Sequence, residues 1–178
     1  GLADDAAVID IAGQQLVITH DMMVEGVHWR SADDPADVAW KLVSVNLSDL
    51  AAKGANPLGV LLGFGLGDDD WDRRFALGLD AALKHYGVAL LGGDTVREPG
   101  VRHVGMTALG MATHVPVPGR DGARAGDMLF VTGTLGDAMA GFEDASNEVL
   151  TAAFLRPHAL LSEGQILAPL VHAIMDVS

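Results

Sequence analysis

Carboxylates stand at the ends, or on the buried faces, of elements that the sequence predicts for the core. Asp94 follows the apolar run 88–91 and two glycines, in the order Leu-Gly-Gly-Asp-Thr. A strand that ends in Gly-Gly exposes backbone N–H groups, which a phosphate can approach closely. Because a carboxylate repels a phosphate, Asp94 suits such a site only when a divalent cation lies between the two. The sequence therefore predicts a Mg²⁺–nucleotide site near Asp94.

Three further acids occupy comparable positions. Asp5 precedes a predicted strand, Asp21 directly follows one, and Asp49 lies on the apolar stripe of a predicted helix. A carboxylate on such a buried face is costly unless it is paired or bound to metal. Each acid alone is equally explained as a cap or turn residue, but all four together favour one shared cation site. Oxygen ligands in a chain without cysteine suit Mg²⁺ or Mn²⁺ better than zinc.

Histidine and arginine side chains add candidates for contacts with anionic ligands. His28 lies in an irregular stretch, residues 20–31, where it either positions a polar substrate or is an ordinary surface histidine. Arg120 and Arg124 stand in and beside a stretch rich in proline and glycine, where they either clamp phosphates or are solvated. The common phosphate-loop, zinc-protease and serine-hydrolase motifs are absent from the sequence.

Composition excludes several classes of function. The 178 residues include 24 acidic and 11 basic side chains, and the net charge of −13 disfavours nucleic acid or anionic membrane as a partner. The absence of cysteine excludes disulfides, thiolate metal sites and cysteine nucleophiles, and fits a cytoplasmic enzyme. Apolar residues at 49% and charged residues at 20% indicate a globular chain.

Hydrophobic periodicity and turn residues predict the order of elements. Predicted strands cover residues 6–11, 14–19, 58–66, 88–91, 101–111 and 128–132, and predicted helices cover residues 35–53, 68–86, 147–155 and 159–175, with a further helix opening near residue 137. Several strands are neighbours in sequence, which favours an α+β fold over a doubly wound sheet. We expect a first domain at residues 1–114, a linker at 115–124 and part of a second domain at 125–178. Both ends of the sequence lie inside predicted motifs, so we expect the chain to belong to a longer protein.

Three blocks of sequence together resemble thiamine-monophosphate kinase. They are DMMVEGVHW at residues 21–29, VNLSDLAAKGA at residues 45–55, and GGDT at residues 92–95. The match continues in order along nearly the whole chain, although the GGDT block alone is shared with a wider superfamily. That superfamily includes aminoimidazole-ribonucleotide synthetase, selenophosphate synthetase and hydrogenase-maturation proteins.

The resemblance implies a reaction and a fold. The reaction is ATP-dependent phosphorylation of thiamine monophosphate to thiamine diphosphate, with several Mg²⁺ ions and a substrate phosphate oxygen as nucleophile, so no general base is assigned. The implied enzyme is a cytoplasmic homodimer that binds neither nucleic acid nor membrane. Its N-terminal α/β domain dimerises through a mixed or antiparallel sheet into a shared barrel, and the start of a second α+β domain follows.

The same resemblance assigns roles to individual residues. It implies metal ligands at Asp5, Thr19, His20, Asp21, Asp49, Asp94 and Asp176. It implies ATP contacts at Gly93, Asp94, Arg120 and Ser178, and a substrate contact at His28. Two positions depart from the family pattern: His20 stands where Thr or Ser is usual, and Ala3 stands where Gly is usual. If the ligand at position 20 is a backbone carbonyl the change is harmless, whereas a hydroxyl ligand would be lost.

Two alternative functions stay open from the sequence. One is another ATP-using synthetase of the same superfamily, which the loop at residues 25–28 argues against. The other is a non-catalytic acidic dimerisation module, which has no physical need for carboxylates at all the matched positions.

Overall fold

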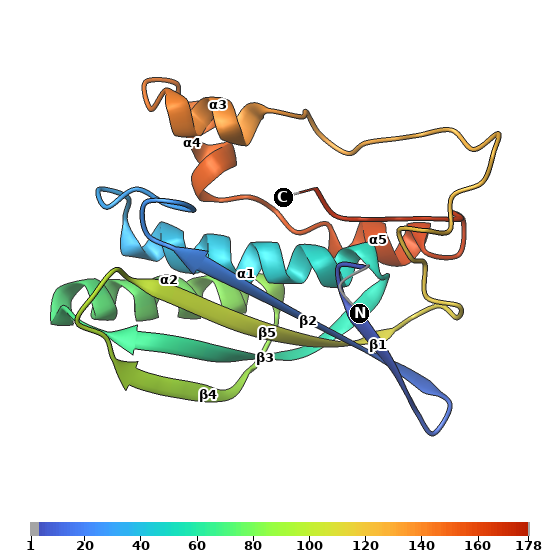
Figure 1. Ribbon diagram of the computed structural model, residues 1–178, viewed down its shortest axis with the longest axis horizontal. Helices are drawn as coiled ribbons and strands as arrows, with labels where there is room; N and C mark the ends of the chain where they lie inside the picture. The colour runs from blue at the N-terminus through green and yellow to red at the C-terminus, as the bar shows by residue number, and fades with distance from the viewer. Residues whose placement is uncertain (1–3, 178) are drawn as a thin grey trace.

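The structure, a computed structural model that describes residues 4–177, is an α+β fold built on one mixed sheet (Figure 1). The elements are β1 (Ala7–Ile11), β2 (Gln14–Val24), α1 (Pro35–Ala52), β3 (Ala55–Leu66), α2 (Asp69–Tyr86), β4 (Leu90–Arg97), β5 (His103–Ala112), α3 (Asp137–Glu143), α4 (Glu148–Leu155) and α5 (Leu161–Leu167). The strand order is β1-β2-β5-β3-β4, and only the β3–β4 pair is parallel. The predicted α+β class is confirmed.

Helix α1 lies at the centre of the molecule, with the sheet on one side, α2 beside it, and α3 and α4 on the side away from the sheet (Figure 1). It begins as predicted: the Asp34 carboxylate accepts a hydrogen bond from the backbone N–H of Ala36, and Pro35 fits the first turn. It ends before Gly54, whose φ of 57° is a backbone conformation that glycine adopts without strain. Because β2, β5, α2 and α5 all contact it, α1 is buried on most sides, as its nearly continuous apolar sequence predicts.

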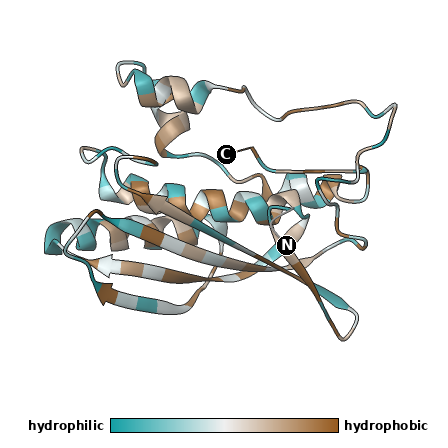
Figure 2. Cartoon of the chain, viewed as in Figure 1, coloured by the Kyte–Doolittle hydropathy of each residue, from teal (hydrophilic) through white to brown (hydrophobic). Residues whose placement is uncertain are grey.

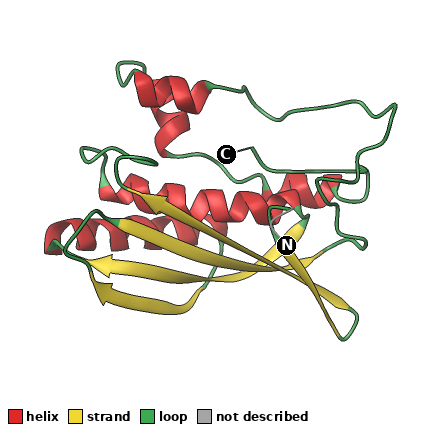
Figure 3. Cartoon of the chain, viewed as in Figure 1, coloured by secondary structure: helices red, strands yellow, loops and turns green. Residues whose placement is uncertain are grey.

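Helix α2 packs beside α1 and extends the helical layer on one face of the sheet (Figure 3). Its N-cap is Asp68 and its C-cap is the left-handed Gly87, so the helix closely matches the range of 68–86 predicted from the sequence. Trp71 and Phe75 stack on Phe64 of β3, which fixes α2 to the sheet. Within residues 4–177, none of the helices combines the length and apolarity that a membrane crossing needs.

The two faces of the sheet have different surroundings. On β2 and β5, alternate residues such as Val17, Met23 and Met106 are buried beneath the helices. The opposite face carries exposed apolar side chains, and brown segments mark the strands in Figure 2. The large exposed apolar residues of the strands are Val8, Ile9, Ile11, Met22, Leu58, Leu61, Leu66, Leu90, Leu91 and Val96. The prediction that the sheet dimerises into a barrel stays a prediction.

The differences between predicted and observed boundaries of β2 and β4 change the place of site residues. Strand β2 runs to Val24, so residues 20–24 are not a loop: Asp21 pairs with Met106 of β5 in a continuous ladder. Strand β4 begins at Leu90 and contains the Gly-Gly-Asp-Thr block, which we expected to follow the strand as a turn. A Cβ atom at Gly93 would clash with the backbone of Leu62, so this glycine permits the close pairing of β4 with β3.

Two predictions beyond residue 124 are also wrong. Residues 128–132 form no strand, because no strand of the described residues lies beside them and their apolar side chains stay exposed. Helix α5 ends at Leu167 and not near residue 175, and Pro169, which lacks a backbone N–H, follows directly. The chain then runs back as an extended segment over α1 (Figure 3). The proposed domain boundaries at 114 and 125 stay a prediction.

The contact between α1 and α2 predicts the effect of one small substitution. A Cβ atom at Gly78 would clash with the backbone of Ala36, which cannot move aside as a flexible side chain can. We expect Gly78→Ala to lower the free energy of unfolding by about 2 kcal/mol, although alanine favours helix formation. Urea denaturation measures the change. Leu77→Ala, at an exposed position of the same helix, is the control, and equal effects in both variants would contradict the close contact.

Candidate active site

Three carboxylates that are distant in sequence meet beside α1. Asp5 precedes β1, Asp49 lies in the last turns of α1, and Asp176 lies in the segment that returns over that helix. One oxygen of each lies within 4.8 Å of the others. Like charges so close together repel strongly where little water screens them, so the cluster needs compensating protons or cations.

One oxygen atom of the cluster has no hydrogen-bond partner. The Asp5 side chain is 3% exposed, and its Oδ2 accepts no hydrogen bond from any of residues 4–177. A buried carboxylate oxygen without a partner is costly, and an oxygen-binding cation would satisfy it. The donor set of the cluster, oxygen atoms of aspartate and threonine, fits the hard ion Mg²⁺.

Thr19 connects two of these acids. Its side chain is buried on the helix-covered face of β2, where the hydroxyl donates to Oδ2 of Asp49 and lies 3.2 Å from the backbone carbonyl of Asp5. The hydroxyl therefore orients Asp49 towards the cluster and leaves a lone pair available to a cation.

Burial and mutual repulsion raise the pKa values of the central acids. The pKa of Asp49 is raised to about 7: burial is the main cause, the Thr19 hydroxyl opposes the rise, and the neighbouring carboxylates of Asp176 and Asp21 add to it. The pKa of Asp176 is raised by burial and by Asp21, and the pKa of Asp21 is raised by burial. A bound cation would favour the ionised form of these carboxylates, which burial and mutual repulsion otherwise make costly.

Basic side chains border the cluster on one side. The Lys53 ammonium pairs with Asp4 and lies 3.6 Å from Oδ2 of Asp5. The Arg120 guanidinium pairs with the other oxygen of Asp5, and its Nε lies 3.9 Å from Asp4. Arg120, which we expect to contact ATP, therefore lies next to the acids. Its ion pairs with Asp4 and Asp5 were not predicted from the sequence.

Asp21 and His28 form the neighbouring part of the site. The backbone N–H of Asp21 donates to the side-chain oxygen of Asn46 on α1, at 3.1 Å. His28 lies in the turn after β2, where its Nδ1 accepts from the N–H of Val24 and its carbonyl accepts from Lys41. The neutral ring therefore carries its proton on Nε2 and can donate to a ligand. His20 and His28 are both near enough to Asp21 to oppose the rise in its pKa.

Three other predicted residues lie apart from the cluster. The His20 side chain alternates with Thr19 and projects to the opposite face, where Nδ1 lies 2.9 Å from the Thr107 hydroxyl. Position 20 can therefore offer the cluster only its backbone carbonyl. Gly93 and Asp94 lie on β4, three strands away from Asp21 in the order β2-β5-β3-β4. At about 4.8 Å for each strand spacing this is roughly 14 Å, too far for one ion to bind both Asp21 and Asp94 of one chain.

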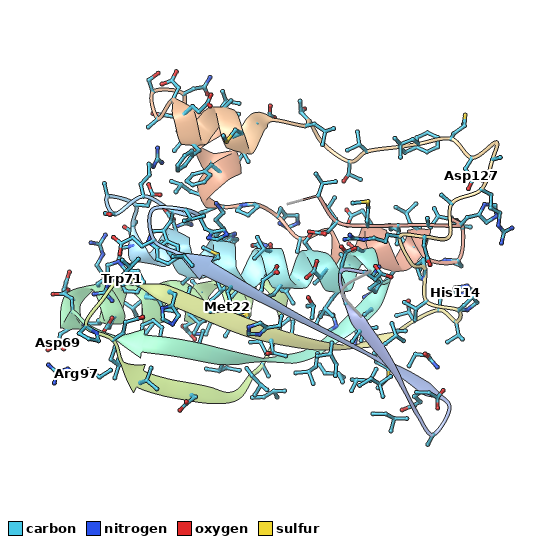
Figure 4. All side chains as sticks on the ribbon, in the orientation of Figure 1. Met22, Asp69, Trp71, Arg97, His114 and Asp127 are labelled. Atoms are coloured by element: carbon cyan, nitrogen blue, oxygen red, sulfur yellow. The ribbon has the colours of Figure 1, made fainter. Side chains whose placement is uncertain are left out.

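Three further positions singled out from the sequence are Ala3, Arg124 and Ser178. Ser178 and Ala3 lie outside the described residues. Arg124 lies near His172, which in turn contacts Asp127, in the long loop at the far end of α5 (Figure 4). Its role as a phosphate clamp is therefore not supported by any contact with Arg120 or the acids among the described residues.

Lys53 is the functional candidate that sequence reasoning missed. It stands four residues after Asp49, so the helical repeat places both on one face of α1. The sequence signal that could have identified Lys53 is its position on the same buried stripe of the helix as Asp49. Asn46 and Asp4 carry no comparable pattern, because their roles depend on contacts between distant segments.

Comparison with known proteins identifies the family of the chain. The sequence profile of the family described as "AIR synthase related protein, N-terminal domain" matches residues 3–112, more than half of the chain. The chain belongs to this family. Its sheet, helix α1 and all the predicted site residues from Asp5 to Asp94 fall within the matched region.

Several similar proteins share one name. Proteins named thiamine-monophosphate kinase are 39% identical in Escherichia coli K12 and 38% identical in Salmonella typhimurium, each alignment covering 100% of this chain. A third, from Caulobacter vibrioides, is 46% identical over 85% of this chain. The chain spans 58% of the length of the first two relatives and 44% of the third. The resemblance inferred from the sequence blocks is confirmed.

Solved structures extend the similarity to three dimensions. A structure described as AaThiL complexed with AMPPCP and TMP has a TM-score of 0.91 and 32% identity, covering 99% of this chain and 60% of that chain. The thiamine monophosphate kinase of Aquifex aeolicus gives a TM-score of 0.88 at 30% identity, covering 100% of this chain and 63% of that one. Hydrogenase maturation protein HypE, at 24% identity and a TM-score of 0.71, shares the fold.

The raised pKa of Asp49 predicts how stability depends on pH. Because the folded chain holds this proton more tightly than the unfolded chain, the contribution of Asp49 is fully present below about pH 4 and is lost as the pH rises through about 7. Asp49→Asn removes this loss, so in chelator without metal the variant should gain stability over the wild type between pH 4 and 8, on the order of 3 kcal/mol. Denaturant unfolding across that range measures it. A constant difference between the two proteins at every pH would contradict the buried, repelled carboxylate.

Proposed function

We propose that this chain carries the Mg²⁺- and ATP-binding domain of a thiamine-monophosphate kinase, a phosphotransferase that converts thiamine monophosphate into thiamine diphosphate. The observation that carries the proposal is the convergence of Asp5, Asp49 and Asp176 around a buried oxygen without a partner. The relatives named for this activity and the similar structure described with AMPPCP and TMP support it. Because the chain spans 58% of those relatives, the activity belongs to the complete protein in which it occurs.

The acids and the threonine would hold the metal. Bound Mg²⁺ would neutralise the phosphates of ATP and of the substrate, whose mutual repulsion otherwise opposes the transfer. Asp49 and Asp5 are fixed for this by Thr19, and Asp21 is fixed by the amide of Asn46. The nucleophile is an oxygen that is already anionic, so the chain has to position and neutralise groups rather than remove a proton.

Arg120 and His28 would contact the two substrates. Arg120 lies at the edge of the acid cluster with a half-exposed side chain, so it can exchange its carboxylate partners for phosphate oxygens. His28 is exposed and offers an N–H to a polar group of thiamine monophosphate. Because Asp21 lies near both His28 and Asp49, the two substrates would meet beside Asp21.

We further propose a cytoplasmic homodimer in which Asp94 serves the site of the second copy. Within one chain, three strand spacings separate Asp94 from Asp21. The exposed apolar side chains of the strands, among them Leu61 and Val96, support an association through the sheet. A C₂ dimer would then hold two equivalent composite sites.

Removal of the central carboxylate should abolish the reaction. In the complete protein, Asp49→Ala should lower kcat for thiamine diphosphate formation by at least about a hundredfold, because the metal loses a buried ligand. Asp80→Asn, which removes an exposed carboxylate on α2, is the control and should keep full activity. Product is measured by chromatography with thiamine monophosphate and ATP. Near-normal turnover by Asp49→Ala would refute the cluster as the metal site, and turnover of a different acceptor alone would favour another superfamily activity.

His28 should affect one substrate more than the other. We expect His28→Ala to raise KM for thiamine monophosphate by about tenfold, the effect of one lost hydrogen bond, with KM for ATP nearly unchanged. Steady-state kinetics with each substrate varied in turn give both values. An equal rise in the two KM values would contradict a specific substrate contact.

A composite dimer site predicts complementation between inactive variants. Asp49→Asn and Asp94→Asn homodimers should each be inactive, whereas refolding an equal mixture should restore about a quarter of the wild-type activity. Half of the randomly formed dimers contain both variants, and one of the two sites in each of those has both acids intact. Activity that stays at the level of the separate variants would show that Asp49 and Asp94 do not form a composite site across the dimer.

A further inference from the structure

Lys53 is a buried cation beside the acid cluster, and neither the sequence blocks nor the proposed reaction assigns it a role. Its side chain is 1% exposed, although lysine is among the residues that are least often buried. It ends α1 on the same face as Asp49, one helical turn away, and its ammonium reaches the acids that precede β1.

Every polar contact of the Lys53 ammonium lies within or next to the cluster. It donates to Oδ1 of Asp4, lies 3.6 Å from Oδ2 of Asp5, and donates to the carbonyl of Pro118 at 3.4 Å. The oxygen of Asp5 that it approaches is the one without a hydrogen-bond partner. A lysine that served only to neutralise Asp4 would not need to stand beside that oxygen.

We propose that Lys53 is a built-in monovalent counter-ion that sets how strongly the cluster holds divalent cations. This inference rests on the proposed metal site. Lys53 is a positioning residue: its charge lowers the negative potential at Asp5, and its contact with Asp4 keeps that acid away from the metal. Free Mg²⁺ is then bound weakly, so that the ions enter and leave with the phosphates of the nucleotide instead of remaining in the protein.

Lys53 places a charge at short range in a site with little water. A positive charge a few ångströms from a cation site opposes binding of a divalent ion, and burial keeps the interaction from being screened. Arg120 also neutralises Asp5, but its side chain is half-exposed and can move away, whereas Lys53 is enclosed. Lys53 therefore supplies the permanent part of the opposing charge.

The test is binding of Mn²⁺, without nucleotide, to the chain and its variants, followed by the electron paramagnetic resonance of the free ion. Lys53→Met keeps an unbranched side chain of similar length but removes the charge, and should lower the Kd for Mn²⁺ about tenfold. Asp4→Asn removes the carboxylate that neutralises Lys53, so the lysine charge acts more strongly on Asp5. This variant should raise the Kd for Mn²⁺ about tenfold. The double variant D4N/K53M replaces the ion pair with a neutral pair and should bind within about threefold of the wild type.

Lys84→Met is the matched control, because Lys84 pairs with Asp80 on the exposed side of α2 at 2.7 Å. It removes the same charge from the surface and should leave the Kd unchanged. If Lys53→Met does not fold, Asp4→Asn still tests the proposal in the opposite direction.

The outcomes separate this inference from the proposed function. Wild-type binding with an unchanged or raised Kd in Lys53→Met, or an unchanged Kd in Asp4→Asn, would overturn the role of Lys53 alone. Absence of Mn²⁺ binding by every protein in the set would overturn the metal site and this inference together. The proposal would be supported if the Kd for Mn²⁺ rises as the net charge of the Asp4–Lys53 pair becomes more positive, while the thermal stability of the variants shows no such trend.

Discussion

Repulsion among the carboxylates beside α1 is the constraint on which the rest of the site depends. Asp5, Asp49 and Asp176 bring their oxygens within 4.8 Å of one another, in a place where Asp49 is 5% exposed. Water cannot screen these charges, so the protein itself must compensate for them. It does so with a hydroxyl from Thr19, the cations of Lys53 and Arg120, and a proton that Asp49 holds near neutral pH. An incoming divalent cation would replace the proton and satisfy the unpartnered oxygen of Asp5.

The fold maintains this unfavourable arrangement because each acid stands on a different, independently stabilised segment. Asp49 is fixed by the apolar packing of α1 against the sheet, and Thr19 by the ladder between β2 and β5. The segment that carries Asp176 is held next to residues 115–124 by the hydrogen bond from the N–H of Ile174 to the carbonyl of Gly119. Packing energy distributed over the core therefore balances the local electrostatic cost, a trade that is common where a site must bind a cation.

The sequence predicted the parts of this site that depend on local pattern. The apolar stripe of α1 identified Asp49 as a buried acid, and the predicted helices at residues 35–53 and 68–86 closely match α1 and α2. Asp176 was assigned through the family resemblance, because its approach to Asp49 depends on the path of a long irregular segment. The face on which His20 lies could not be predicted either. The strand was expected to end at Thr19, so the alternation of side chains between the two faces of the sheet was not applied to residue 20. Asp94 was expected at a turn beside the other acids, whereas the close pairing of Gly93 with β3 places it inside a strand.

The central claim is that these acids form a divalent cation site, and anomalous diffraction tests it most directly. Crystals of the chain grown with Mn²⁺ and a non-hydrolysable ATP analogue would be measured at the manganese absorption edge. The account predicts an anomalous peak about 2.2 Å from carboxylate oxygens of Asp5 and Asp49, close to the distance expected for a small divalent ion. An ordered, nucleotide-bound structure with no manganese peak between these acids, and with the Lys53 and Arg120 pairs unchanged, would contradict it.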